Sequence, residues 1–160
     1  MRRLFLAASL LALAACGPAA ETPAPAPTSP SAPAASAEVD VAAMQARIAA
    51  LDAPYNAGDF DAGRRAFAQC RSCHTANQGG GNRVGPNLYG VFGREIGTAE
   101  GFAYSQAVQD ADFTWDPAQL DHWLENPRTF LPGNRMAFAG VRDETQRRDL
   151  IAYLLVTTSE

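Results

Sequence analysis

The sequence predicts an all-α fold, in which several helices are joined by one long glycine-rich loop. Apolar residues recur every three or four positions in residues 39–51, 59–71 and 143–156, which is the spacing of amphipathic helices. No stretch shows the alternation of apolar and polar residues that is typical of a half-buried strand. Residues 75–101 carry many of the glycines and follow neither period. Because so long a loop is uncommon inside a compact domain unless it is functional, we expect it to wrap a large cofactor.

The first residues have the pattern of a secretory signal. Two arginines precede an apolar run over residues 4–15, and this run is well short of the ~20 residues that a transmembrane helix needs. We therefore predict a signal peptide at residues 1–15 rather than a permanent membrane span. Leu-Ala-Ala-Cys at residues 13–16 resembles the lipobox of bacterial lipoproteins, which predicts a lipid on Cys16. An ordinary cleavage site beside an incidental cysteine is the alternative.

Residues 17–38 are rich in proline and alanine. They hold six of the chain's 11 prolines, eight alanines and no aromatic residue, so they cannot build a core. With Cys16 they are interpreted as a lipidated tether, residues 16–38, on the periplasmic side of a bacterial membrane. A proline-rich chain extends by ~3.1 Å per residue, which gives this tether a reach of up to ~70 Å.

The rest of the chain is divided into a helical lead-in segment, residues 39–58, and one domain, residues 59–160. Four apolar residues of the lead-in segment lie at helical spacing: Val41, Met44, Ile48 and Leu51. They predict a short amphipathic helix that leads into the domain. The same residues could equally form a helical extension of the tether.

Aspartates that can cap a helix open each of the later helical stretches. Asp59 or Asp61 precedes one helix, Asp143 precedes another, and Asp116 is followed by Pro117, a residue favoured at the first helical position. An Asn-Pro pair then stops the middle helix. The predicted helices span residues 59–71, 117–125 and 143–156.

Composition excludes several kinds of chemistry. All 13 basic residues are arginine, so neither a P-loop lysine nor a Schiff-base lysine is present. Two histidines and three cysteines are too few for a disulfide scaffold or a metal site with many such ligands. The formal charge of −4 argues against nucleic acid as a general partner.

Residues 70–74 have the spacing C-x-x-C-H, which is that of c-type haem attachment. Cys70 and Cys73 can each add to one of the two vinyl groups of a haem, while His74 turns its imidazole onto the iron. Half of a zinc site would need another Cys or His pair, and none remains. A thioredoxin-like redox pair would need a β-α-β context, which the sequence lacks. We therefore predict one haem c bound through Cys70 and Cys73, with His74 as an iron ligand.

Three side chains could supply a second sulfur or imidazole ligand. Met44 lies on the apolar face of the lead-in helix, where packing is the simpler role. His122 lies in the helix over residues 117–125, where a surface or structural role is simpler. Met136 lies in an irregular Pro- and Gly-rich segment that offers no obvious packing reason for a methionine.

From about residue 59 to its end the chain resembles the class I cytochromes c of the mitochondrial and bacterial cytochrome c2-like type. The resemblance rests on motifs spread along the whole domain besides C-x-x-C-H: Gly63-x-x-x-Phe67, Val84-Gly85-Pro86-Asn87-Leu88, Phe92-Gly93-Arg94, Gly101-Phe102-x-Tyr104, Trp115, Glu125-Asn126-Pro127, Pro132-Gly133 to Gly140, and Asp149 to Leu154. It implies the class I cytochrome c fold, with its helices wrapped around one haem and with the first and last helices of that fold crossing at Gly63.

The resemblance also implies the other residues around the haem. Met136 would be the second iron ligand, and the Pro86 carbonyl would accept the Nδ1 proton of His74. Arg94, Tyr104 and Trp115 would lie near the haem propionates, although plain core packing is the alternative for the two aromatic residues. The remaining residues expected at the haem are Trp123, Asn134 and Phe138.

Three positions depart from the pattern of the family. Trp123 stands where the family has a tyrosine that bonds the methionine sulfur, Val108 replaces an asparagine that helps hold a buried water, and Asn134 replaces a threonine. These changes leave the expected ligands intact. They alter the internal hydrogen-bond network and therefore the fine tuning of the potential.

With both axial positions filled, the expected function is outer-sphere transfer of one electron rather than catalysis. The partners that the resemblance implies are a quinol:cytochrome c oxidoreductase as donor and a haem-copper terminal oxidase as acceptor, both bound to the membrane. A photosynthetic chain in place of a respiratory one, or another acceptor, is the alternative, and the carrier is expected to be a monomer. The family docks through a basic rim, for which the matching residues here are Arg83, Arg128 and Arg135, with Arg142 nearby; scattered solvated arginines are the alternative. A haem peroxidase or gas-binding protein and a fixed subunit of a larger complex are the competing functions.

Overall fold

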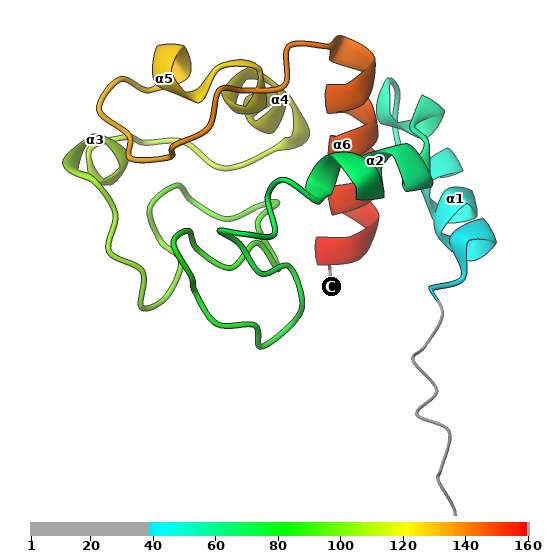
Figure 1. Cartoon of the computed structure of the whole chain (residues 1–160), viewed down its shortest axis with the longest axis horizontal. Helices are drawn as coiled ribbons and strands as arrows, with labels where there is room; N and C mark the ends of the chain where they lie inside the picture. Colours follow the sequence, from blue (N-terminus) through cyan, green and yellow to red (C-terminus); the bar gives the residue numbers. More distant parts are fainter. Residues whose placement is uncertain (1–38, 160) are drawn as a thin grey trace, which may run out of the picture. The chain divides into compact units, whose positions relative to one another are not determined.

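The computed structural model describes residues 39–159. In the view of Figure 1 its helices lie above and to the right of a long loop region. The predicted signal peptide, Cys16 and the tether lie outside the described residues. The helices are α1 (Val41–Ala49), η1 (Tyr55–Ala57, a 3-10 helix), α2 (Phe60–Phe67), α3 (Gln106–Gln109), α4 (Pro117–Glu125), α5 (Pro127–Phe130) and α6 (Glu144–Thr158). Within this part of the chain no strand forms, and one isolated antiparallel bridge joins Glu95 to Thr114. The all-α prediction is therefore confirmed.

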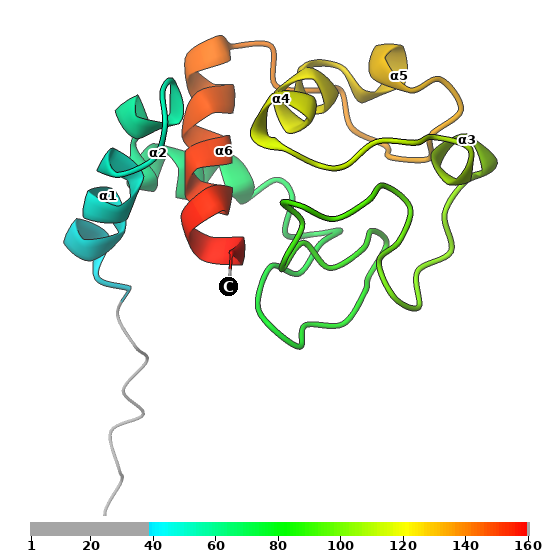
Figure 2. The same cartoon turned by 180° about the vertical axis from the view of Figure 1, so that it is seen from behind.

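Helix α6 forms the centre of the domain. In both views it stands between α1 on one side and α3, α4 and α5 on the other (Figures 1 and 2). Its residues Leu150, Ile151 and Ala152 are fully buried. Burial of its apolar residues against elements on both sides ties the two halves of the domain together.

Helix α2 crosses α6 at Gly63. A Cβ atom at this position would overlap the carbonyl oxygen of Asp149 and would lie 2.6 Å from the Cβ of Tyr153. The ring of Tyr153 packs between Phe60 and Phe67 of α2, with centroid separations of 5.3 and 5.4 Å. Only a glycine lets the two backbones approach so closely, which explains why this crossing falls where the sequence resemblance placed it.

Aspartate side chains cap the four longer helices. Asp40, Asp59, Asp116 and Asp143 each accept a hydrogen bond from the backbone N–H three residues later. Helix α4 has the bounds that the sequence predicted. Helix α6 begins one residue after its predicted start and continues two residues beyond the predicted end.

The prediction of a helix over residues 59–71 is wrong for its last four residues. Helix α2 ends at Phe67, and the bonds beyond it change to the tighter pattern in which Ala68 N–H donates to Arg65 O and Cys70 N–H donates to Phe67 O. The chain therefore turns before the two cysteines instead of carrying them along one straight helix.

The lead-in segment packs as part of the folded domain. Ile48 is fully buried in the core, and Met44 and Leu51 pack against the core from positions that are partly exposed. The side chain of Gln45 donates to Gly58 O at 2.8 Å and accepts from Phe60 N–H at 2.8 Å, which satisfies a free donor at the start of α2. These contacts are those expected of a helix that leads into the domain.

Short helices and the long loop complete the domain. Residues 75–101 contain neither helix nor strand, as predicted, while η1, α3 and α5 were not predicted because three or four residues are too few to show a period. None of the helices between residues 39 and 159 has both the length and the apolar character that crossing a membrane requires.

Candidate functional site

The C-x-x-C-H motif follows α2 as a turn at the wall of a cavity of about 720 Å³. Cys73 N–H and His74 N–H both donate to Cys70 O, at 3.1 and 2.9 Å, so the turn is closed by its own backbone. Cys70, Cys73 and His74 all line the cavity. The cavity volume lies within the ~300–1,000 Å³ that is usual for sites of small molecules and cofactors.

The imidazole of His74 is held from behind by the backbone of the next loop. Its Nδ1 lies 2.7 Å from Pro86 O. Because a carbonyl oxygen can only accept, Nδ1 carries the proton and Nε2 keeps a free lone pair for a metal. Gly85 packs against the same ring, and a Cβ at that position would overlap it.

Burial shifts the pKa of His74 and of the free Cys70 thiol toward their uncharged forms. Burial lowers the pKa of His74, against the opposing effect of the hydrogen bond to Pro86, so the ring is neutral at neutral pH. Burial raises the pKa of Cys70 to about 11, and the neighbouring Cys73 adds to this effect. Cys70 is therefore an uncharged thiol at neutral pH, which suits an apolar wall.

Met136 is the only one of the three candidate second ligands that lines the cavity. The side chain of Asn134 orders the backbone at Met136. It accepts from Met136 N–H at 2.9 Å and donates to the carbonyls of Pro127 and Leu131. Met44 lies instead on α1, and His122 is exposed on α4. Both of these are thus placed away from the cavity.

Aromatic side chains form the wall between α4, α5 and the loop that precedes α4. Trp115 and Trp123 line the cavity and meet edge to face, with ring centroids 5.5 Å apart. Phe113 and Phe130 complete a closed cluster of four rings, and Phe138 lines the cavity from the Met136 segment. Trp123 therefore packs as one aromatic ring among others.

Another part of the cavity wall is polar, and it is formed by Arg94, Tyr104 and Ser105. A haem carries two propionate carboxylates, which need such polar surroundings. Arg94 is partly buried, its guanidinium donates to Tyr89 O and Asn87 O, and burial lowers its pKa. The ion pairs of residues 39–159 do not include Arg94. A carboxylate in the cavity would compensate this buried charge.

Ser105 was missed by the sequence analysis. Its position just before α3 is that of a capping serine, but its hydroxyl caps nothing. Within the described residues its Oγ is a buried polar atom without a hydrogen-bond partner. An unpaired hydroxyl in the wall is the observation expected where a ligand oxygen completes the bonding. The residues present therefore fit a haem: two thiols, an oriented imidazole, a thioether, an apolar wall and a polar end.

The four arginines expected in a basic rim are all exposed. Arg83 and Arg135 line the cavity, and they donate to Arg71 O and Ala103 O at 3.0 and 2.6 Å. Arg128 lies on α5, and Arg142 lies just before the start of α6. Beside Arg83, Val84 is an apolar residue that is 79% exposed, and it was not singled out as a surface feature in the sequence.

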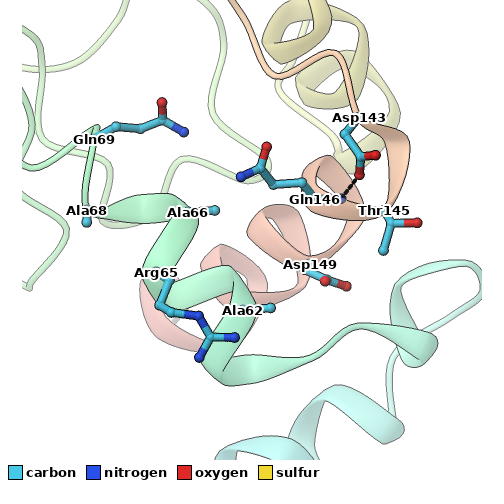
Figure 3. Close-up of a pocket in the computed structure, with 9 residues that line it drawn as sticks. All are labelled: Ala62, Arg65, Ala66, Ala68, Gln69, Asp143, Thr145, Gln146 and Asp149. Atoms are coloured by element: carbon cyan, nitrogen blue, oxygen red, sulfur yellow. Dashed lines mark hydrogen bonds between the residues drawn. The ribbon is translucent and has the colours of Figure 1, made fainter.

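A second hollow lies on the surface beside the crossing of α2 and α6 (Figure 3). The two carboxylates of this groove are engaged with the protein: Asp143 caps Gln146 N–H, and Asp149 accepts from Arg148 and from Asp59 N–H. It contains none of the residues that the sequence singled out for the site.

Comparison with known sequences finds a family match that includes every residue lining the cavity. The sequence model of the cytochrome c family matches residues 60–158. The cytochrome c of Chlamydomonas reinhardtii is 49% identical over 104 residues, which cover 64% of this chain and 93% of that protein. The cytochrome c2 of Blastochloris viridis is 45% identical over 107 residues, which cover 67% of this chain and 84% of that protein.

Comparison with solved structures finds the same fold. Cytochrome cH from Methylobacterium extorquens matches with a TM-score of 0.57 and 43% identity, over 61% of this chain and 98% of that chain. Helix α1 and η1 precede the range that the family model covers.

Proposed function

Because this chain belongs to the cytochrome c family of electron-transfer proteins, which bind one haem c through two cysteines, we propose that it is a membrane-tethered carrier with His74 and Met136 as axial ligands. The observation that carries this proposal is that the oriented imidazole of His74 and the methionine Met136, whose backbone is ordered by Asn134, line the same cavity. Bound haem c supplies the one-electron couple of its iron. His74 and Met136 would hold that iron, and the apolar side chains of the wall would exclude water from it.

The side chains of the cavity also set the electrostatic environment of that couple. The Pro86 carbonyl fixes the tautomer of His74 and raises its basicity. The aromatic cluster of Trp115 and Trp123 keeps the distal wall apolar, and Arg94 offsets negative charge at the polar end. Thioether ligation and an apolar environment both favour a high potential, which suits the oxidising end of a respiratory chain.

We place the carrier between a quinol:cytochrome c oxidoreductase and a haem-copper terminal oxidase, on the periplasmic side of a bacterial membrane. A lipid on Cys16 and a tether of up to ~70 Å would confine the domain near both complexes and raise its effective concentration. The test is to mix the mature holoprotein with membranes that contain each complex. Quinol-dependent reduction and oxygen-dependent oxidation are expected, and failure of both reactions would contradict this placement.

The Cys16→Ser variant tests the anchor. We expect wild-type protein in the membrane fraction and the variant in the soluble periplasmic fraction, because serine cannot carry the thioether-linked lipid. The haem absorbance should be unchanged, since the C-x-x-C-H motif is untouched. Electron transfer with intact membranes should slow several-fold because the local concentration falls, whereas rates with detergent-dispersed complexes should not change. Equal partition of the two proteins would contradict the lipid anchor.

The Arg128→Glu variant tests the basic rim. Arg128 is exposed on α5, and reversal of its charge should slow oxidation by the partner several-fold at low salt and much less at high salt. Arg65→Glu is the matched control, because Arg65 is an exposed arginine of α2 that lines the groove of Figure 3 and does not line the cavity. Stopped-flow rates at two ionic strengths make the measurement. Equal slowing in both variants would indicate a general charge effect and not a docking site.

A further inference from the structure

The segment that carries Met136, residues 131–142, is irregular and is fastened at both ends. At its start the side chain of Asn134 bonds the carbonyls of Pro127 and Leu131, each at 2.8 Å. Between the two ends, the main chain makes a short local bond from Phe138 N–H to Met136 O at 3.0 Å. The position of Met136 therefore depends on what holds the far end of the segment.

That far end lies against α4. Val141 N–H donates to Leu124 O at 2.7 Å, and Gly140 adopts a φ of +97° that brings its Cα against the last turn of α4. Here a Cβ would overlap Glu125 O, so the approach requires glycine. The carbonyls of Val141 and Arg142 then face Arg147 of α6, whose Nη1 donates to them at 3.0 and 3.2 Å.

Arg147 is itself held by Asp121 of α4. Its Nε donates to Asp121 Oδ1 at 2.8 Å, and its Nη2 donates to Asp121 Oδ2 at 3.2 Å, which is the two-bond geometry of an arginine fork. The side chain of Arg147 is 7% exposed, and that of Asp121 is 27% exposed. One guanidinium thus joins α4, α6 and the end of the Met136 segment.

We propose that Asp121 and Arg147 are positioning residues that keep Met136 at the iron by fixing the end of the segment that carries it. This inference rests on the proposed ligation by Met136. Loss of the guanidinium leaves the carbonyls of Val141 and Arg142 without their donor and leaves Asp121 as an unpaired carboxylate. Residues 137–142 then gain conformational freedom, and the sixth position of the iron opens more often.

The test is the affinity of the ferric holoprotein for imidazole, a small ligand that binds only when Met136 has left. In wild-type protein imidazole should bind weakly and should remove the red-end charge-transfer band of methionine-ligated ferric haem. In Arg147→Gln the apparent affinity should rise about tenfold or more, because a buried charged hydrogen-bond network is lost. Asp121→Asn keeps one oxygen acceptor for Arg147 and should show a smaller rise; it also remains informative where Arg147→Gln folds poorly.

Arg148→Gln is the matched control. Arg148 is the next residue of α6 and loses an ion pair of similar length, 3.0 Å to Asp149, without touching residues 140–142. Its imidazole affinity should stay within about twofold of wild type, even if its melting temperature falls as far as that of Arg147→Gln. Unchanged affinity in both Arg147→Gln and Asp121→Asn would overturn the inference, as would an equal rise in Arg148→Gln. A wild-type protein without the band would instead overturn the proposed ligation itself.

Discussion

A double variant, Cys70→Ser with Cys73→Ser, is expected to lose haem and with it most of its helical structure. The cavity of about 720 Å³ is continuous with the hydrophobic core, because buried core residues line it, including Phe67, Leu124 and Leu150. An unfilled hollow of this size leaves the residues around it without packing partners, while the whole domain is stabilised by only ~5–15 kcal/mol. Helices α2, α4 and α6 therefore cannot keep their packing without the group that fills the space between them.

Far-UV circular dichroism and haem absorbance of the purified chain provide the measurement. We expect the double variant to show little haem, reduced ellipticity and no cooperative thermal transition. Cys16→Ser is the matched control, because it makes the same substitution outside the motif and should retain haem and helicity. A double variant that stays fully helical and melts cooperatively without haem would show that the core closes on itself.

The helices that the sequence predicted well are those whose ends carry their own chemical signal. Asp116 with Pro117 opens α4 and an Asn-Pro pair closes it, so both bounds could be predicted from local residues. The end of α2 could not, because apolar spacing fades gradually after Phe67 while the actual stop is set by the turn that brings the motif to the cavity. Helices α3 and α5 are single turns, held by tertiary packing that a periodicity cannot reveal.

Some residues of the candidate site could likewise be predicted from the sequence, and others could not. Residues 70–74 are contiguous, so their chemistry is visible in the sequence. The resemblance implied the other haem residues, and the structure places all of them in the cavity wall. Ser105 and the pair of Asp121 and Arg147 were not predicted. The serine has the sequence position of a cap, and the ion pair joins two residues that lie 26 positions apart in the sequence, so only the folded chain shows either role.

The lead-in segment, with α1 and η1, precedes the residues that the family model covers. The sequence left open whether residues 39–58 belong to the tether or to the domain. The burial of Ile48 and the two hydrogen bonds of Gln45 at the start of α2 assign them to the domain. Within the described residues, α1 and the α3–α5 half lie on opposite sides of α6 (Figures 1 and 2).

The Met136→Ala variant is expected to open the sixth position of the iron without unfolding the protein. Alanine has no sulfur to donate, while the Asn134 bonds that order the segment use backbone groups that alanine keeps. The ferric protein should therefore lose its red-end charge-transfer band, the ferrous protein should bind carbon monoxide, and the potential should fall by ~0.1 V or more. Met44→Ala is the matched control, because Met44 packs on α1 and does not line the cavity, so its variant should lose some stability but keep the band and exclude carbon monoxide. A Met136→Ala protein that retains the band, or a Met44→Ala protein that loses it, would place the second ligand elsewhere in the chain.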